Sequence, residues 1–303
     1  MRLAGVLILA LAVSAGSRTE TTGNISAPGY QTGTTSASEQ AGTGPDTLII
    51  GATGDIMIGS WLIEVLGRNG ADWPYEEVLP VLQSTDLLVG NLESPFLSDT
   101  TGITPAAKTY TFAVPSDHVA TITAGGFDLV GLANNHILDY GPAGLYETWE
   151  TLEAAGIAHV GTGLTKAEAH SHTILDRKGR QVAFLAYSHT FPEEFWATSD
   201  RPGTAHASDE GLAREVRRAD AAADLVVVMF HWGGELLEEP REYQQILARI
   251  AIDNGADLVI GHHPHTIQQP AGCLGQIGKM GGDHFSAPGV SGHHYVRNDV
   301  PAF

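Results

Sequence analysis

Apolar residues cluster in short runs that alternate with longer segments of mixed polarity. Most of these runs are apolar at every position, which is typical of strands buried on both faces. Their alternation with helical segments predicts an α/β architecture. The runs cover residues 48–52, 87–90, 129–133, 182–187, 225–230 and 258–260.

Two intervening segments have apolar residues at helical spacing. Residues 142–155 and 240–254 predict helices that end at Gly156 and Gly255, because glycine commonly terminates helices. Between two strand runs, residues 176–180 predict a hairpin turn. The expected apolar faces are Leu145, Trp149 and Leu152 in the first helix, and Tyr243, Ile246, Leu247, Ile250 and Ala251 in the second.

The N-terminal region has the pattern of an exported protein. An apolar run at 6–13 with small residues up to Ala15 predicts a secretory signal peptide over 1–15; a membrane-spanning helix is the weaker alternative because the run is short. Residues 16–45, rich in Thr, Gly and Ser, predict a flexible linker. We therefore expect an extracellular or envelope-associated protein whose folded domain covers 46–269.

Composition narrows the classes of function. The 303 residues include 16 Lys and Arg against 35 Asp and Glu, a formal net charge of −19. Such an acidic chain repels phosphate backbones, which argues against general nucleic-acid binding. Cys273 is the single cysteine, which excludes an internal disulfide and a cysteine-based zinc site. The fourteen histidines are the unusual feature of this composition.

Potential ligand side chains follow five of the predicted strands. In open α/β sheets, ligands collect at the carboxyl ends of the strands, so these side chains are expected at one rim. One such residue alone is more often a cap or a turn residue, but five strand ends with carboxylates, amides and imidazoles favour a metal site. The residues are Asp55; Asn91 and Glu93; Asn134, Asn135 and His136; His231; and His262, His263 and His265.

The strongest single signal is Gly-His-His-Pro-His at 261–265. His263 and His265 at i, i+2 on an extended chain point the same way, and imidazole is a common ligand of transition metals. His231 closes a buried strand, where a neutral core histidine is the usual alternative.

Asp139 lies three residues after His136 and has two interpretations. It orients the imidazole of His136 by a hydrogen bond, or it caps the helix that follows. Capping is slightly favoured.

Several segments resemble the capsule-synthesis family CapA, also described as poly-γ-glutamate synthesis proteins. The resemblance covers roughly 47–269 and implies a four-layer α/β/β/α sandwich, similar to the calcineurin-like metallophosphatases, with a metal site at the strand ends. The segments are Gly-Asp-Ile-Met at 54–57, Asp-Leu-Leu-Val-Gly-Asn-Leu-Glu-Ser-Pro at 86–95, 126–136 with Asp-Tyr-Gly at 139–141, His-Trp-Gly at 231–233, and 255–265.

The resemblance also implies ligand positions, with two departures from the phosphatase pattern. Met57 stands where a phosphatase has histidine, and Asn91 stands where a carboxylate would bridge two metals, although Glu93 could reach in instead. A thioether is a poor ligand for the metals of such sites, so one ion is favoured over two. The implied metal ligands are Asp55, Asn91, Glu93, Asn135, His231, His263 and His265.

The tail, residues 270–303, departs from the family. It has no strand pattern and is rich in Gly and His, as expected of a frame-shifted or truncated end; a metal-binding tract is the weaker alternative. We therefore expect a sandwich without its C-terminal closing strands, and an atypical or disordered tail.

Three functions follow from the resemblance. The first is an exported hydrolase that uses a divalent transition metal (zinc, manganese or iron) on a phosphate ester or an anionic polymer, with His136 as general acid and Asp139 beside it. The second is a non-catalytic surface component of a membrane-bound polymer synthesis complex. The third and weakest is a phosphoesterase of small substrates.

Overall fold

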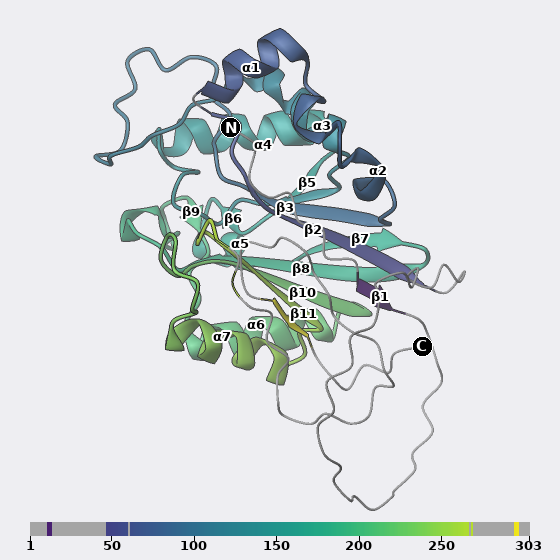
Figure 1. Ribbon diagram of the computed structural model, residues 1–303. Coiled ribbons are helices and arrows are strands. Elements are labelled where there is room, and N and C mark those ends of the chain that lie inside the picture. Colours follow the sequence, from purple (N-terminus) through teal and green to yellow (C-terminus); the bar gives the residue numbers. More distant parts are fainter. Residues whose placement is uncertain (1–10, 14–46, 60, 267, 269–293, 297–303) are drawn as a thin grey trace, which may run out of the picture.

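The fold consists of two five-stranded sheets that pack face to face, with helices on both outer faces (Figure 1). The computed structural model describes residues 11–13, 47–59, 61–266, 268 and 294–296. The predicted linker at 16–45 and most of the predicted tail lie outside the described residues.

The first sheet has the strand order β1-β2-β3-β4-β5, in which β2 to β5 are parallel and β1 is antiparallel to β2. Its strands are β1 (Leu11–Val13), β2 (Leu48–Ile56), β3 (Leu87–Leu92), β4 (Leu129–Gly131) and β5 (Ala158–Val160). Its outer face is covered by α1 (Trp61–Asn69), α2 (Leu79–Leu82), α3 (Val119–Gly125) and α4 (Gly141–Ala154), with the short helices η1 (Trp73–Tyr75) and η2 (Ser116–His118) between them (Figure 1).

The second sheet has the order β12-β11-β10-β8-β7, with β8, β10 and β11 parallel. Its strands are β7 (Thr173–Arg177), β8 (Arg180–Ser188), β10 (Leu225–His231), β11 (Leu258–His262) and β12 (His294–Val296). Helices α6 (Asp209–Asp220) and α7 (Glu242–Asp253) cover its outer face. The ladder of β6 (Thr162–Gly163) and β9 (Gly203–Thr204), α5 (Lys166–Ala169) and η3 (Glu193–Phe195) complete the described elements.

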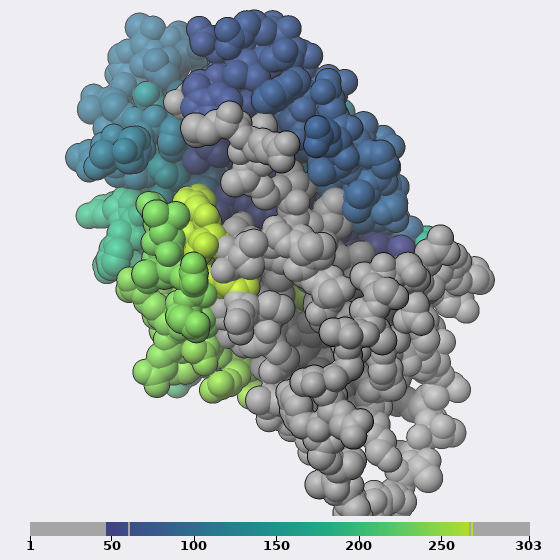
Figure 2. Space-filling model, in the orientation of Figure 1, coloured from purple at the N-terminus to yellow at the C-terminus, as the bar shows by residue number. Residues whose placement is uncertain are grey.

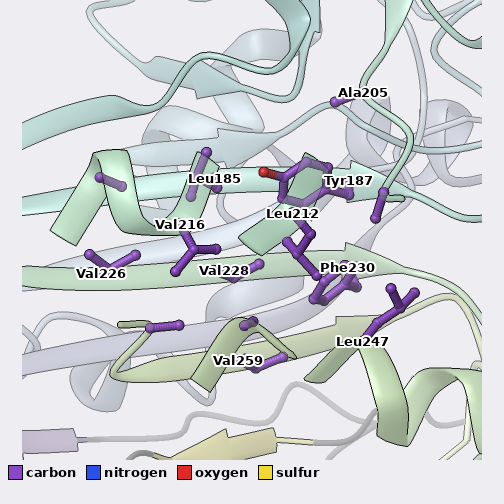
Figure 3. Close-up of a cluster of buried hydrophobic side chains, with 14 of the residues drawn as sticks. Leu185, Tyr187, Ala205, Leu212, Val216, Val226, Val228, Phe230, Leu247 and Val259 are labelled. Atoms are coloured by element: carbon purple, nitrogen blue, oxygen red, sulfur yellow. The ribbon is translucent and has the colours of Figure 1, made fainter. Parts of the chain in front are cut away.

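Alternate residues of each central strand enter different apolar layers. In β10, Val227 and Met229 point into the layer between the two sheets, whereas Val228 and Phe230 pack beneath α6 and α7 (Figure 3). Burial of each such side chain contributes about 1.5–3 kcal/mol. This double burial explains the continuously apolar runs, and it confirms the predicted four-layer α/β/β/α sandwich.

Every predicted strand run coincides with a strand, and both predicted helices form. Gly156 and Gly255 follow α4 and α7 with positive φ values of 72° and 116°, and the predicted turn joins β7 to β8 as an antiparallel hairpin. One position differs from the predicted helix faces: Ile246 is 41% exposed, because the buried face of α7 is turned toward Ala248 and Ile252 instead.

Two short strands lie in the terminal segments. β1 falls within the predicted signal peptide and pairs with the edge of β2. β12 falls in the tail, where no strand was expected, and pairs antiparallel with the edge of β11. Among the described residues, no helix is both long and apolar enough to cross a bilayer.

Candidate metal centre

The carboxyl ends of strands from both sheets meet at one rim of the sandwich. Asp55 of β2 lies opposite Asn91 of β3, and His231 of β10 lies opposite His262 of β11. Figure 2 shows the yellow-green segment around the end of β11 at the surface, between the blue part and the green part of the molecule. The site is thus assembled from two separate sheets.

The Asp55 carboxylate is the centre of the hydrogen-bond network. Its Oδ1 accepts from Asn91 Nδ2 at 2.8 Å, and its Oδ2 accepts from the backbone N–H of His263 at 3.0 Å and lies 3.1 Å from His265 Nδ1. Burial raises the pKa of Asp55, but the His265 hydrogen bond and the charges of His231 and His262 outweigh it and hold this pKa well below its usual value. The carboxylate is therefore ionised and able to bind a cation.

Glu93 follows β3 and is 1% exposed. Its Oε1 lies 3.3 Å from His231 Nε2, but its buried Oε2 has no hydrogen-bond partner. Burial raises the pKa of Glu93 well above its usual value, and the neighbouring Asp55 and Glu235 raise it further. An unsatisfied buried oxygen is costly, and a bound cation would both satisfy it and favour its ionised form.

The imidazoles of His231 and His263 are buried. His231 is 1% exposed, and its Nε2 lies 2.7 Å from Asn135 Oδ1. Burial, followed by the charge of His263, lowers the pKa of His231 well below its usual value. Burial lowers the pKa of His263 to about 4, and its Nδ1 has no partner. Neutral imidazoles with a free nitrogen are the form that binds metals, and His263 offers such a nitrogen. Both ring nitrogens of His231 are engaged, since its Nδ1 also lies 3.1 Å from Asn91 Nδ2.

One group of ligand atoms already has a geometry that could hold an ion. Atoms of Glu93, His263 and His265 all lie within 4.8 Å of one another. His263 and His265 converge through a turn, with positive φ values of 91° and 51°, rather than through the strand alternation that the sequence suggested. Such a backbone is strained for non-glycine residues and is found preferentially at functional sites. The side chain of His265 is 40% exposed, which gives solvent access to the group.

Asn91 and Asn134 support the hydrogen-bond network, but neither directs its side-chain oxygen toward the candidate ligand cluster. Asn134 Nδ2 donates to Asn91 Oδ1 at 3.2 Å, and Asn134 Oδ1 accepts from the backbone N–H of His136 at 3.0 Å. Asn91 therefore presents its NH₂ group to Asp55 and His231, and an NH₂ group is not a metal ligand. Asn91 was a predicted ligand; this geometry suits it to orienting Asp55.

His136 and Asp139 form a buried pair beside the cluster. His136 Nδ1 lies 2.8 Å from Asp139 Oδ2, and the same oxygen accepts from the backbone N–H of Phe112 at 2.8 Å. Helix α4 begins at Gly141 after the N-cap residue Tyr140, which makes no side-chain cap. Asp139 therefore orients His136, and the slightly favoured capping role is wrong.

Sequence reasoning missed Lys108 and assigned no role to His262. Lys108 Nζ lies 2.5 Å from Asp139 Oδ1, yet it belongs to an irregular loop whose sequence gives no signal. His262 was noted at the strand end; its Nε2 lies 3.2 Å from Thr53 O and its Nδ1 lies 3.3 Å from Phe230 O. A neutral imidazole carries one N–H, so His262 donates to one of these two carbonyls, one in β2 of the first sheet and the other in β10 of the second.

A stack of rings borders the rim on the side of the second sheet. The ring of His206 lies 3.7 Å from that of Trp196 and 4.7 Å from that of His189, which in turn stacks on Tyr243 at 4.7 Å. The backbone N–H of His189 donates to the carbonyl of His231 at 2.8 Å, which joins the stack to the centre.

The fold and the site thus define an α/β/β/α protein with a candidate metal centre at its strand ends. Residues 49–271 match the family described as "Bacterial capsule synthesis protein PGA_cap". The chain belongs to this capsule-synthesis family, as the sequence motifs predicted.

Three relatives cover most of this chain. It is 32% identical over 228 residues to the capsule biosynthesis protein CapA of Bacillus anthracis, spanning 74% of this chain and 56% of that protein. It is 30% identical to the PGA biosynthesis protein CapA of Bacillus subtilis, over 74% and 59%. Identity to a probable polyglutamine synthesis accessory protein of Mycobacterium tuberculosis is 30%, over 75% and 63%. The chain therefore spans less than two thirds of the length of these relatives.

Two solved structures overlap the chain in part. A hypothetical protein from Thermus thermophilus has a TM-score of 0.42 at 18% identity, over 72% of this chain and 68% of that one. The NAD nucleotidase of Haemophilus influenzae has a TM-score of 0.39 at 14% identity, over 62% and 31%.

Proposed function

We propose that this chain is an exported, metal-dependent hydrolase of polymer synthesis that acts on a phosphate ester or an anionic polymer. The observation that carries the proposal is the unsatisfied ligand group: Glu93 Oε2 and His263 Nδ1 are buried without hydrogen-bond partners, and both residues share a cluster of ligand atoms with the accessible His265, whose Nε2 lies 3.9 Å from Glu93 Oε2. Buried polar atoms without hydrogen-bond partners are rare, and an ion bound between these residues would give both atoms a partner.

The donor set suits one divalent transition metal. Carboxylate and imidazole ligands together fit zinc, manganese or iron. A second ion is disfavoured, because Asn91 presents an NH₂ group. The bound ion would supply Lewis-acid polarisation of the scissile group and activation of water. The proposed ligands are Asp55, Glu93, Asn135, His231, His263 and His265.

His136 is placed to move a proton. Its Nδ1 is held by Asp139 Oδ2 at 2.8 Å, so its Nε2 is the nitrogen available to a leaving group. An Asp-bound imidazole keeps one orientation, which is the property that a general acid needs. Asp139 is fully buried and serves this orientation.

The second candidate function is a non-catalytic component of a membrane-bound polymer synthesis complex. The names of the relatives favour it, since they describe capsule, PGA and polyglutamine synthesis and not a reaction. In that case the centre would hold structure or bind an anionic polymer. The net charge of −19 disfavours binding of such a polymer by electrostatic attraction alone.

Metal content tests the centre. We expect the purified protein to contain about one transition-metal ion per chain, and we expect His263→Ala and His265→Ala each to lose it. His159→Ala is the matched control, because His159 stacks on Trp149 away from the rim. Equal metal content in the three variants, measured by elemental analysis, would show that the rim histidines do not bind metal.

The variant His136→Ala separates the two functions. We expect it to retain metal and fold and to lose hydrolytic turnover by roughly 10²–10⁴-fold, the usual contribution of a positioned proton donor. Polymer production in cells should fall with turnover. Normal polymer output from a folded, metal-loaded His136→Ala protein would favour the non-catalytic component instead.

A further inference from the structure

Lys108 is a buried cation that reaches the centre from a loop distant in sequence. The loop joins Phe96 to Val114, which pair in an isolated bridge. The Lys108 side chain is 17% exposed, and its Nζ lies 5.3 Å above the ring of Phe195. Burial lowers the pKa of Lys108, while its ion pair with Asp139 acts in the opposite direction.

The ammonium fixes one oxygen of Asp139. Lys108 Nζ lies 2.5 Å from Asp139 Oδ1, and the other oxygen, Oδ2, is bound by His136 Nδ1 at 2.8 Å and by the Phe112 N–H at 2.8 Å. Asp139 is 0% exposed, so its charge needs these partners. With both oxygens engaged, the carboxylate has one orientation, and so has the imidazole it holds.

The same ammonium holds the neighbouring asparagine. Lys108 Nζ donates to the backbone carbonyl of Asn135, whose side-chain Oδ1 lies 2.7 Å from His231 Nε2. One side chain therefore contacts the candidate ligand Asn135 and the candidate acid His136, the latter both through Asp139 and directly, since Lys108 Nζ lies 3.2 Å from His136 Nδ1.

The loop is fastened to the site on both sides of Lys108. The backbone N–H of Ala106 donates to the carbonyl of Asp139 at 2.7 Å, and the ring of Phe112 lies 4.7 Å from that of His136. The loop thus presents Lys108 at a fixed place instead of leaving it to sample many conformers.

We propose that Lys108 is a positioning residue that sets the placement of Asn135 and His136. The part that concerns His136 rests on the proposed hydrolase function; the part that concerns Asn135 needs only that the centre binds a metal. A displacement of a ligand or an acid by about 1 Å is enough to cost on the order of 10²-fold in rate.

Lys178 offers a matched control. Its Nζ also bonds one backbone carbonyl, Thr47 O at 2.9 Å, and one carboxylate, Asp86 Oδ2 at 2.8 Å. It lies in the β7–β8 turn, at the end of the strands opposite the rim. Lys178→Met therefore removes the same kinds of bond without touching the centre.

The experiment measures the affinity of the full chain for Zn²⁺ and Mn²⁺ in Lys108→Met, Lys108→Arg and Lys178→Met. We expect Lys108→Met to weaken binding by roughly 10- to 100-fold, the usual effect of removing a group that orients a ligand. Lys108→Arg, which keeps the charge and the donors, should recover most of it, and Lys178→Met should bind as the unaltered chain does.

The sign of the change is decisive. A purely electrostatic role predicts tighter binding in Lys108→Met, because a positive charge near a cation site has been removed. Tighter or unchanged binding in Lys108→Met would overturn the proposal. Where hydrolysis is measurable, we expect kcat to fall more than KM rises, since the acid is misplaced while the substrate still binds.

Two further measurements keep the outcomes distinct. If the unaltered chain binds metal but hydrolyses nothing, the hydrolase function fails while the affinity comparison still decides the role of Lys108. If Lys108→Met does not fold, Lys108→Gln replaces it, and hydrogen exchange of the Phe112 amide reports whether the loop stays attached. Full affinity in a folded Lys108→Gln protein with an exchanging Phe112 amide would contradict the proposal.

Discussion

His206 is a partly buried imidazole whose environment opposes its charged form. Burial, followed by the charge of His189, lowers the pKa of His206 from its usual 6.5 to about 4. The unfolded chain therefore binds a proton at this residue at a higher pH than the folded chain does. Its contribution to stability is fully present above pH 6.5 and is lost as the pH falls toward 4.

We expect the free energy of unfolding to decrease as the pH is lowered from 6.5 to 4. The free energy of unfolding of His206→Phe should decrease less steeply over the same range. Phenylalanine keeps a ring against Trp196 but takes up no proton. Denaturant unfolding at several pH values measures both slopes. The same slope in both proteins would mean that other groups govern acid unfolding.

Single residues at the strand ends could be predicted, because position after a buried strand fixes which rim a side chain reaches. Asp55, Glu93 and His231 meet for that reason. Lys108 could not be predicted, since its place depends on the path of an irregular loop. The approach of His263 to His265 was predicted, but its cause, a left-handed turn, is a tertiary constraint with no local signal.

At the scale of elements, Gly161 marks a point where the two sheets approach closely. It follows β5 in the first sheet with a φ of 94°. A Cβ there would lie 2.8 Å from the Cβ atoms of both Ala133 and Ala186 and 2.9 Å from the carbonyl oxygen of Ala186 in β8. The backbone of β8 cannot move away without disturbing its own ladder.

Gly161→Ala should therefore destabilise the fold more than Gly156→Ala. Both positions have positive φ, which costs about 1–2 kcal/mol for alanine, but a Cβ added at Gly156 would meet no atom within 4 Å. Overpacking at Gly161 adds about 1–3 kcal/mol. Equal losses in the free energy of unfolding, measured by denaturant titration, would show that the two sheets have room for a methyl group at this point.

Elements with a complete apolar pattern were predicted, and those that depend on tertiary contacts were not. The six central strands carry their own signal because both faces are buried. β5 has three residues of which only Val160 is fully buried, and β6 has two residues, so neither forms an apolar run. Helix α6 buries Leu212, Val216 and Ala219 on a narrow stripe among charged residues. Because few of its residues are apolar, the helix was not predicted from the sequence.

At the scale of the whole molecule, we predict that the chain is cut after Ala15 and exported. The apolar run at 6–13 and the small residues that follow it support this. N-terminal sequencing of the exported protein should begin near Gly16, and limited proteolysis should trim it toward Asp46. Cleavage would also remove β1 and leave β2 at the edge of its sheet.

A mature protein that retains Met1 inside the cell would contradict export. An intermediate result is informative too: export without cleavage would leave β1 available to cover the edge of β2.

The layered architecture as a whole followed from the sequence motifs, because their order along the chain matches one family. What the motifs could not show is how the termini complete the sheets. β12 is three residues long and pairs with β11, and nothing in the Gly- and His-rich tail distinguishes those residues from their neighbours.

The division of the candidate ligands between the two sheets also determines the order in which they are synthesised. Asp55 lies in β2, and Glu93 and Asn135 follow β3 and β4 of the same sheet; all three precede every candidate imidazole ligand in the chain. A chain that is synthesised and threaded across a membrane from its N-terminus delivers its carboxylates first and its imidazoles last. If the proposed centre binds an ion and the chain is exported as we predict, the ligand set would be complete only once β11 is in place, and the ion would then be taken up last, in the destination compartment.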